Sequence, residues 1–177
     1  TADILRGKGR ELDYKGFEDS MNLQKETARQ AWSGTGDKET DSTWINIKER
    51  QGEVKFLGYE TSQTKSKVNS IVINNKEEKE VKIGEEAKVM TNESPFYGES
   101  GGQLGDIGNM KWKNGEALVI DTKKFENLII HFVKVIEGVL KVDDEVIMEI
   151  DLDRRNSLKI HHSATHLLHE SLRRNLG

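Results

Sequence analysis

Residues 110–122 read MKWKNGEALVIDT, and this stretch decides the fold. Met110–Trp112 and Glu116–Thr122 have the composition of two short strands. Lys113-Asn114-Gly115 between them is a turn of the hairpin type. Two strands joined by so short a turn run antiparallel, so we expect the surrounding sheet to be antiparallel.

Further short segments of strand-like composition, separated by turn signals, lie on both sides of this hairpin. They cover residues 54–59, 67–73, 86–91, 128–136 and 145–150. Seven or so short strands at near-regular spacing are typical of an antiparallel barrel or sandwich of about 100 residues. No helix-length pattern interrupts them, which argues against a doubly wound sheet. We therefore expect a mainly β fold with flanking helices, built as an antiparallel β-barrel.

Helical periodicity appears before and after these strands. Apolar positions recur at three- and four-residue spacing over residues 13–32, which predicts an amphipathic helix that needs a partner surface. Residues 33–43 contain only small, polar and charged side chains, which is typical of a linker. The helical period returns at Asp153, a candidate N-cap, and continues to about residue 176.

Composition and charge exclude several classes of protein. The 177 residues include no cysteine, which excludes disulfide scaffolds, thiol nucleophiles and cysteine-containing metal sites made from this chain alone. The longest mostly apolar stretch, Leu128–Ile136, is far shorter than the roughly 20 residues of a membrane helix, so we expect no membrane partner. The formal net charge is -4, so any contact with nucleic acid must be local or come from a larger protein, and DNA is not an expected partner.

Four of the five histidines lie between residues 161 and 169, in HHSATHLLH. His162 and His166 are four residues apart on the predicted helix, so their Cβ atoms lie about 5–6 Å apart on one face. A zinc ion about 2.0–2.1 Å from each imidazole nitrogen fits this gap. The competing interpretation is a polar surface pair or a satisfied core site. A zinc protease is disfavoured, because the glutamate of H-E-x-x-H is absent.

Residues 94–108, SPFYGESGGQLGDIG, form the second unusual stretch, called here the glycine segment. It contains five glycines but has neither the spacing of a dinucleotide fingerprint nor the Gly-Lys-Ser/Thr of a P-loop. It predicts a backbone with positive φ at several points that can approach a partner closely. A tight connection between barrel strands is the competing interpretation.

Three segments together resemble the alanyl-tRNA synthetases. TADILRGKGRELDYKGFEDSM is similar to the end of that family's tRNA-recognition region, the glycine segment to a signature of its β-barrel domain, and HHSATHLLHESLRRNLG to the opening of its editing domain. The resemblance runs through nearly the whole chain in order. It implies the end of the recognition region over 1–34, a linker over 35–50, the barrel over 51–151 and the start of the editing domain over 152–177.

The resemblance also implies an activity. Members of this family ligate alanine to tRNA(Ala) with ATP and Mg²⁺ in an upstream domain, and they hydrolyse tRNA(Ala) mischarged with serine or glycine. A cytoplasmic location follows from that role. We expect the present chain to supply the barrel and half of the editing site, and to be inactive alone.

Site residues follow from the motif positions. His162 and His166 would be two zinc ligands, completed by residues beyond this chain, and His161 is an alternative ligand. Thr165 would line the pocket for the mischarged amino acid, faced by the loop around Gly101, Gly102 and Gln103. The basic residues of the last helix would contact tRNA(Ala), although such residues ordinarily form a solvated face. These are Arg154, Arg155, Arg173 and Arg174.

Two other functions remain open at this point. A free-standing trans-editing deacylase shares the barrel and the H-x-x-x-H helix, but the helix predicted over 13–32 favours the synthetase. A non-catalytic barrel that binds or spaces other domains is the second alternative.

Overall fold

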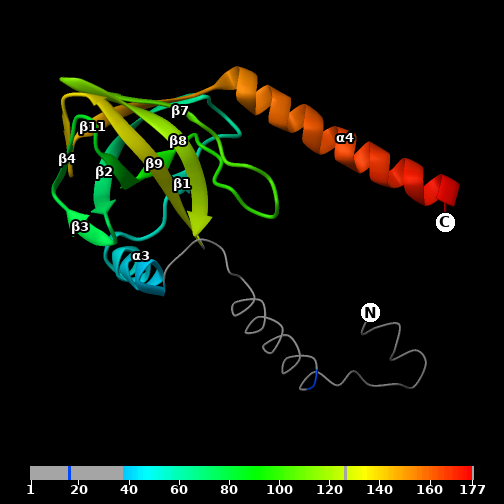
Figure 1. Cartoon of the computed structure of the whole chain (residues 1–177), viewed down its shortest axis with the longest axis horizontal. Coiled ribbons are helices and arrows are strands. Elements are labelled where there is room, and N and C mark those ends of the chain that lie inside the picture. Colours follow the sequence, from blue (N-terminus) through cyan, green and yellow to red (C-terminus); the bar gives the residue numbers. More distant parts are fainter. Residues whose placement is uncertain (1–15, 17–37, 126, 177) are drawn as a thin grey trace. The chain divides into compact units, whose positions relative to one another are not determined.

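Six strands close into an antiparallel barrel in the computed structural model, which describes Gly16 and residues 38–125 and 127–176. The strand order is β11-β7-β8-β9-β5-β2, and β2 pairs back with β11 (Figure 1). The barrel strands are β2 (Gln63–Ile73), β5 (Glu86–Thr91), β7 (Gly108–Trp112), β8 (Gly115–Phe125), β9 (Leu128–Glu137) and β11 (Glu145–Ile150). The predicted antiparallel barrel is therefore confirmed.

Shorter strands complete the barrel unit. β3 (Lys76–Glu78) extends the sheet beside β2. β4 (Glu80–Lys82) and β10 (Val139–Lys141) form an antiparallel pair, and β1 (Lys55–Phe56) runs parallel to β6 (Glu93–Ser94). The predicted hairpin is β7–β8, in which Trp112 pairs with Gly115, so the turn itself is Lys113–Asn114.

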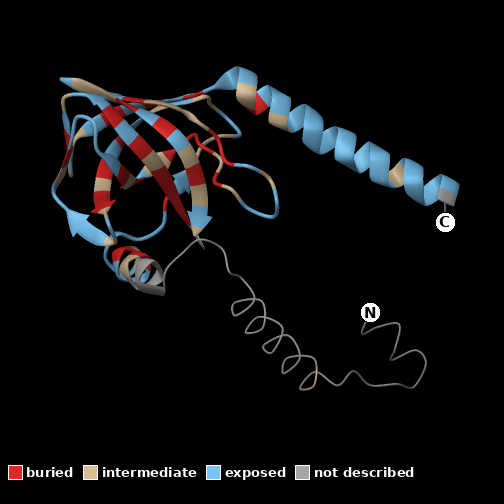
Figure 2. Ribbon diagram, viewed as in Figure 1, coloured by how far each residue is buried: buried red, intermediate tan, exposed pale blue. Residues whose placement is uncertain are grey.

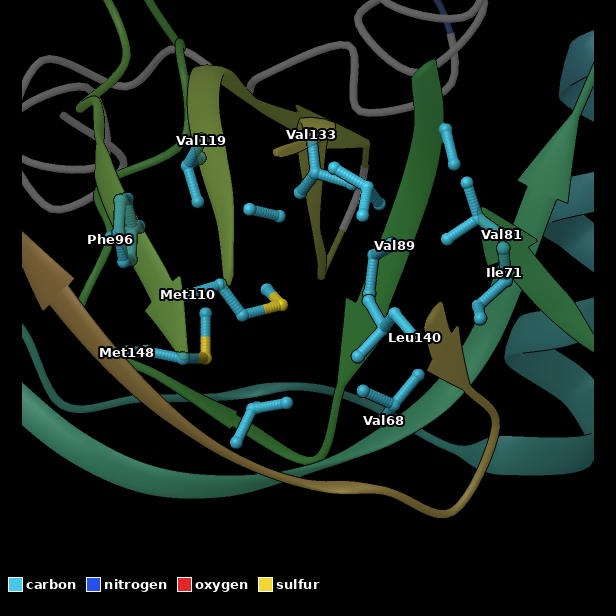
Figure 3. Close-up of a cluster of buried hydrophobic side chains, with 14 of the residues drawn as sticks. Val68, Ile71, Val81, Val89, Phe96, Met110, Val119, Val133, Leu140 and Met148 are labelled. Atoms are coloured by element: carbon cyan, nitrogen blue, oxygen red, sulfur yellow. The ribbon is translucent and has the colours of Figure 1, made fainter. Parts of the chain in front are cut away.

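The barrel interior is packed with apolar side chains (Figure 3). Side chains alternate across a strand, so Ile71 and Val89 point inward, while their neighbours Val72 and Met90 belong to a second cluster on the opposite face. The labelled interior residues of Figure 3 are all buried: Val68, Ile71, Val81, Val89, Phe96, Met110, Val119, Val133, Leu140 and Met148. The period-two pattern of the sequence is thus the pattern of the core.

The second cluster exists because a helix covers it. α3 (Lys38–Gln51) runs through most of the segment 35–50, where the sequence predicts a linker, and this part of the prediction is wrong. Trp44 and Ile47, three residues apart, are buried against Val72 and Met90. Burying an indole and an isoleucyl side chain stabilises a helix whose other residues are mostly polar, which is why the local pattern did not reveal it.

α4 (Leu152–Leu176) confirms the predicted C-terminal helix. Its described side chains beyond Arg155 are almost all exposed (Figure 2). Among the described residues no helix is long and apolar enough to cross a membrane. The helix predicted over 13–32 lies outside the described residues, apart from Gly16.

Candidate functional site

The glycine segment is an ordered loop between β6 and β7. Gly101 and Gly102 have φ of 61° and 83°, and Ser100 and Gln103 on either side exchange backbone hydrogen bonds of 3.3 and 3.1 Å. Two consecutive residues with positive φ inside such a bridge are typical of a type I′ turn, which glycine adopts without strain. The prediction of positive φ is confirmed at these two positions.

Gly105 serves a different purpose. A Cβ atom at this position would overlap the carbonyl oxygen of Thr122 on β8. The Thr122 hydroxyl in turn donates to the carbonyl oxygen of Asp106 at 2.8 Å. The absence of a side chain therefore lets the glycine segment lie directly on β8, so the segment is also the tight barrel connection that was its competing interpretation.

A buried ion pair joins the glycine segment to the start of α4. Arg155 Nε donates to both carboxylate oxygens of Asp106, at 2.8 and 2.9 Å, and Nη2 contacts Oδ2 as well. The other Arg155 bonds go to the carbonyl oxygens of Gly58 and Pro95, each at 3.0 Å. Asp106 also accepts the backbone N–H of Tyr97 at 2.7 Å. Each charge is thus compensated by several hydrogen bonds, as a buried pair requires.

This arrangement changes the interpretation of Arg155. The residue is only 7% exposed, and its guanidinium is committed to Asp106 and two carbonyl groups. In contrast to the sequence-based expectation, it is not available to tRNA phosphates. Nothing in the local sequence pointed to this pair, because its partners are 49 residues apart.

α4 begins one turn before the paired arginine and carries the histidine pair further along. The Asp151 carboxylate accepts the backbone N–H of Arg154 at 2.9 Å, so Asp151 caps the helix instead of Asp153. His162 lies seven residues after Arg155, about 10.5 Å along the axis at 1.5 Å per residue. Because Arg155 holds the first turn on the glycine segment, it sets the direction in which the helix leaves the barrel.

His162 and His166 lie together on α4, as predicted. Their Nε2 atoms are 2.9 Å apart and their ring centroids 4.6 Å apart, and both residues are exposed. Two imidazole nitrogens this close to each other fit two ligand positions of a zinc ion after a small opening of the rings. Across the described ranges, no group of three or more His, Cys, Asp and Glu side chains could hold a metal. Zinc binding by the pair therefore stays a prediction.

Thr165 lies on the same helix, three residues after His162. Its hydroxyl donates to the carbonyl oxygen of His161 at 2.9 Å, which leaves its oxygen lone pairs free to accept a hydrogen bond. Within the described part of the chain, no hydrogen bond or ion pair joins the loop at residues 101–103 to the side chains of His162, Thr165 or His166. Their shared pocket stays a prediction.

Comparison with known proteins bears on this arrangement. Residues 1–154 match the family described as tRNA synthetases class II (A). The chain belongs to this family. It is 42% identical over its full length to an alanine–tRNA ligase of Cereibacter sphaeroides, 42% to one of Rickettsia massiliae and 43% to one of Parvibaculum lavamentivorans. It spans about one fifth of the length of these curated relatives. The resemblance stated from the motifs is confirmed.

Within this member of the synthetase family, the other basic residues of α4 are more accessible than Arg155. Arg173 and Arg174 both pair with Glu170, at 2.9 and 2.7 Å, and both remain largely exposed. Exposed pairs of this kind contribute little and are readily exchanged for another anion. Arg154 is half-buried, and its Nε has no hydrogen-bond partner among the described residues. Contact of these three with tRNA stays a prediction.

His131 lies outside the histidine cluster of residues 161–169, and sequence reasoning did not assign it to any site. It is fully buried on β9, with Nε2 2.8 Å from the Ser94 hydroxyl and Nδ1 3.0 Å from the carbonyl oxygen of Val89. Burial lowers the pKa of His131 from 6.5 to about 4, although the bond to Val89 partly opposes the shift. The neutral ring therefore donates through Nδ1 and accepts from Ser94, which anchors the first residue of the glycine segment. The available signal was that His131 interrupts the apolar run 128–136, as Lys134 also does.

Proposed function

We propose that this chain is part of an alanine–tRNA ligase. The whole protein would attach alanine to tRNA(Ala) with ATP, and would hydrolyse tRNA(Ala) mischarged with serine or glycine. The observation that carries the editing half of this proposal is the Arg155–Asp106 pair, which fastens the glycine segment to the helix of His162 and His166. The pair joins the glycine segment directly to the first turn of α4. ATP and Mg²⁺ would be bound elsewhere in the whole protein, which would work in the cytoplasm.

The chain's own contribution to editing would be selection of the amino acid. A serine ester differs from an alanine ester by one hydroxyl group, which needs a hydrogen-bond partner in a closed pocket. The Thr165 hydroxyl donates to His161, so its oxygen would accept the hydroxyl proton of serine. Alanine cannot make this bond and would gain nothing from the site.

In ester hydrolysis, the carbonyl carbon forms a bond to the water oxygen and loses its bond to the ribose oxygen. Water attacks the carbonyl carbon of the ester, the bond to the ribose oxygen at the tRNA 3′ end breaks, and the free amino acid and tRNA(Ala) leave. His162 and His166 would hold a zinc ion with ligands from outside this chain, and the ion would supply positive charge for positioning or polarisation. The first turn of α4, held by Arg155, would keep the imidazoles and Thr165 in fixed relation to the barrel.

Editing by the whole protein tests the role of Thr165. The variant Thr165→Val keeps the shape of the side chain but loses the hydroxyl. We expect it to deacylate Ser-tRNA(Ala) at least 10-fold more slowly, because a serine hydroxyl would be left unpaired. Deacylation of Gly-tRNA(Ala) should change much less, since glycine has no hydroxyl. Loss of labelled ester over time measures both.

Thr165→Ser is the matched control, since it keeps the hydroxyl, and it should retain most of the activity on Ser-tRNA(Ala). Equal rates for native protein and Thr165→Val on the serine ester would refute the assignment. The 177-residue chain alone, which supplies two imidazoles only, should show no ester loss above buffer.

A further inference from the structure

The outer face of β2, β11 and β7 carries a concentration of lysines. In the strand register, Lys65 of β2 lies opposite Ile147 of β11, and Ile147 lies opposite Lys111 of β7. These three residues are exposed, whereas Ser66 and Met110, the next residues along their strands, are buried. The two lysines therefore leave the same outer face of the barrel, two strand spacings or about 10 Å apart.

A cavity of about 540 Å³ lies in this face. Lys65, Lys67, Lys111 and Lys113 line it and define what we call the lysine pocket. Trp112 also lines it, and its indole Nε1 is shielded without a hydrogen-bond acceptor among the described residues. A buried donor without a partner is uncommon.

The four lysines of the lysine pocket outnumber the three carboxylates nearest to them, which are Glu145, Asp143 and Glu116. Glu145 is the one carboxylate among the residues that line it. Among the described residues, neither Lys65 nor Lys113 forms an ion pair. Lys67 pairs with Asp143 at 2.8 Å and Lys111 with Glu116 at 3.5 Å, but all four side chains are at least 29% exposed, so these pairs are weak and exchangeable. The pocket is thus a local positive site on a chain of net charge -4.

The strands that carry the lysine pocket are already paired along both edges, which limits the kind of ligand that the pocket can bind. β11 is paired on both sides, by β2 and β7, and β2 and β7 have their own second neighbours β5 and β8. No free strand edge is therefore offered here to an added peptide strand. What the face does offer is several ammonium groups around a shallow hollow, which is the chemistry that binds a run of phosphates.

We propose that the lysine pocket binds the phosphate backbone of the RNA on which the proposed enzyme acts. The proposal rests on the proposed function for the identity of the RNA. It places an RNA contact on the barrel itself, on the outer face of β2, β11 and β7. Each lysine would neutralise one phosphate and release its counterions, without reading sequence.

The proposal is tested by the binding of a non-aminoacylated RNA hairpin that copies the acceptor stem of tRNA(Ala). The 177-residue chain and its double variant Lys65→Gln/Lys113→Gln are titrated by fluorescence anisotropy at several salt concentrations. We expect the variant to bind about 3- to 10-fold more weakly near 0.1 M salt. The slope of log K against log salt should become shallower by about 1.5, close to 0.7–0.9 for each lost contact.

Lys76→Gln/Lys79→Gln is the matched control, since it removes two exposed lysines near the other end of β2. It should leave both the affinity and the slope nearly unchanged, and circular dichroism checks that both variants are folded. No detectable binding by the native chain, or equal losses in the two double variants, would overturn the inference. The RNA hairpin carries no amino acid, so its binding does not depend on editing. A negative result in the Thr165 experiment would therefore not affect this test.

Discussion

At the scale of single residues, His131 shows how surroundings set chemistry. Its imidazole has no exposed surface and bridges Ser94 and Val89 in a tautomer with the proton on Nδ1. A charged ring in this place would lose hydration, and Ser94 would have to reverse its hydrogen bond. Burial and these partners together favour the neutral form, so His131 is a structural residue at neutral pH.

The free energy of unfolding should therefore depend on pH through His131. The folded-state pKa is lowered to about 4 from 6.5, so between these values the unfolded chain binds more protons. The stabilisation is complete above about pH 6.5 and is lost as the pH falls toward 4, by about 2 kcal/mol between pH 7 and 4.5. Urea unfolding at a series of pH values measures this.

Because carboxylates also titrate in this range, the His131 ring should be followed separately by NMR. Its ring signals should stay those of the neutral form down to about pH 5. A midpoint near 6.5 for this ring in the folded chain would contradict the prediction.

At the scale of elements, α3 shows how a largely polar helix depends on its buried side chains. Among residues 43–51, the part of α3 whose side chains the structure describes, only Trp44 and Ile47 belong to the buried core. Gly52 with φ of 79° ends the helix. Ion pairing of Arg50 with Glu77 at 2.5 Å is exposed and adds little. The helix depends on the barrel because its apolar contacts lie on the outer faces of β2, β5 and β9.

Substitution of Trp44 tests this dependence. Trp44→Ala should lower the free energy of unfolding by about 3–5 kcal/mol, because it leaves a cavity between α3 and the barrel. Ile45→Ala, at the adjacent position with 44% exposure, should cost less than about 1 kcal/mol. Urea denaturation of the two variants makes the comparison. Similar losses for both would show that α3 does not depend on this contact.

At the scale of the whole molecule, one ion pair links the barrel to α4. Arg155 and Asp106 are 8% and 2% exposed in their side chains, so both charges depend on each other for compensation. Almost all the other described side chains of α4 are exposed, including Ile160, Leu167 and Leu168 at 60–73%. The direction of the helix is therefore set almost entirely within its first turn.

Asp106→Asn should destabilise the chain by about 3–5 kcal/mol, because it leaves the Arg155 guanidinium buried without a counter-charge. Amide hydrogen exchange in residues 152–157 should accelerate as the first turn of α4 is released. Asp121→Asn is the control, since Asp121 is 39% exposed and lies 4.0 Å from Lys123, and it should cost less than about 1 kcal/mol. Unchanged exchange in α4 of the Asp106 variant would disprove the link.

Short-range pattern determined much of this protein. Alternating apolar residues predicted the strands, and 86–91 and 145–150 agree with β5 and β11 at both ends. Four-residue spacing placed His162 and His166 on one face of a helix, because the turn of a helix is a local property. The turn at Gly101 and Gly102 follows likewise from the backbone freedom of glycine.

Only the tertiary structure decided the rest. Whether residues 38–51 fold depends on an apolar surface from distant strands, and the partner of Arg155 depends on which carboxylate barrel closure brings beside it. The same closure buried His131 and gathered the lysines of β2 and β7 on either side of β11. Such contacts join residues far apart in the chain, and local periodicity carries no information about them.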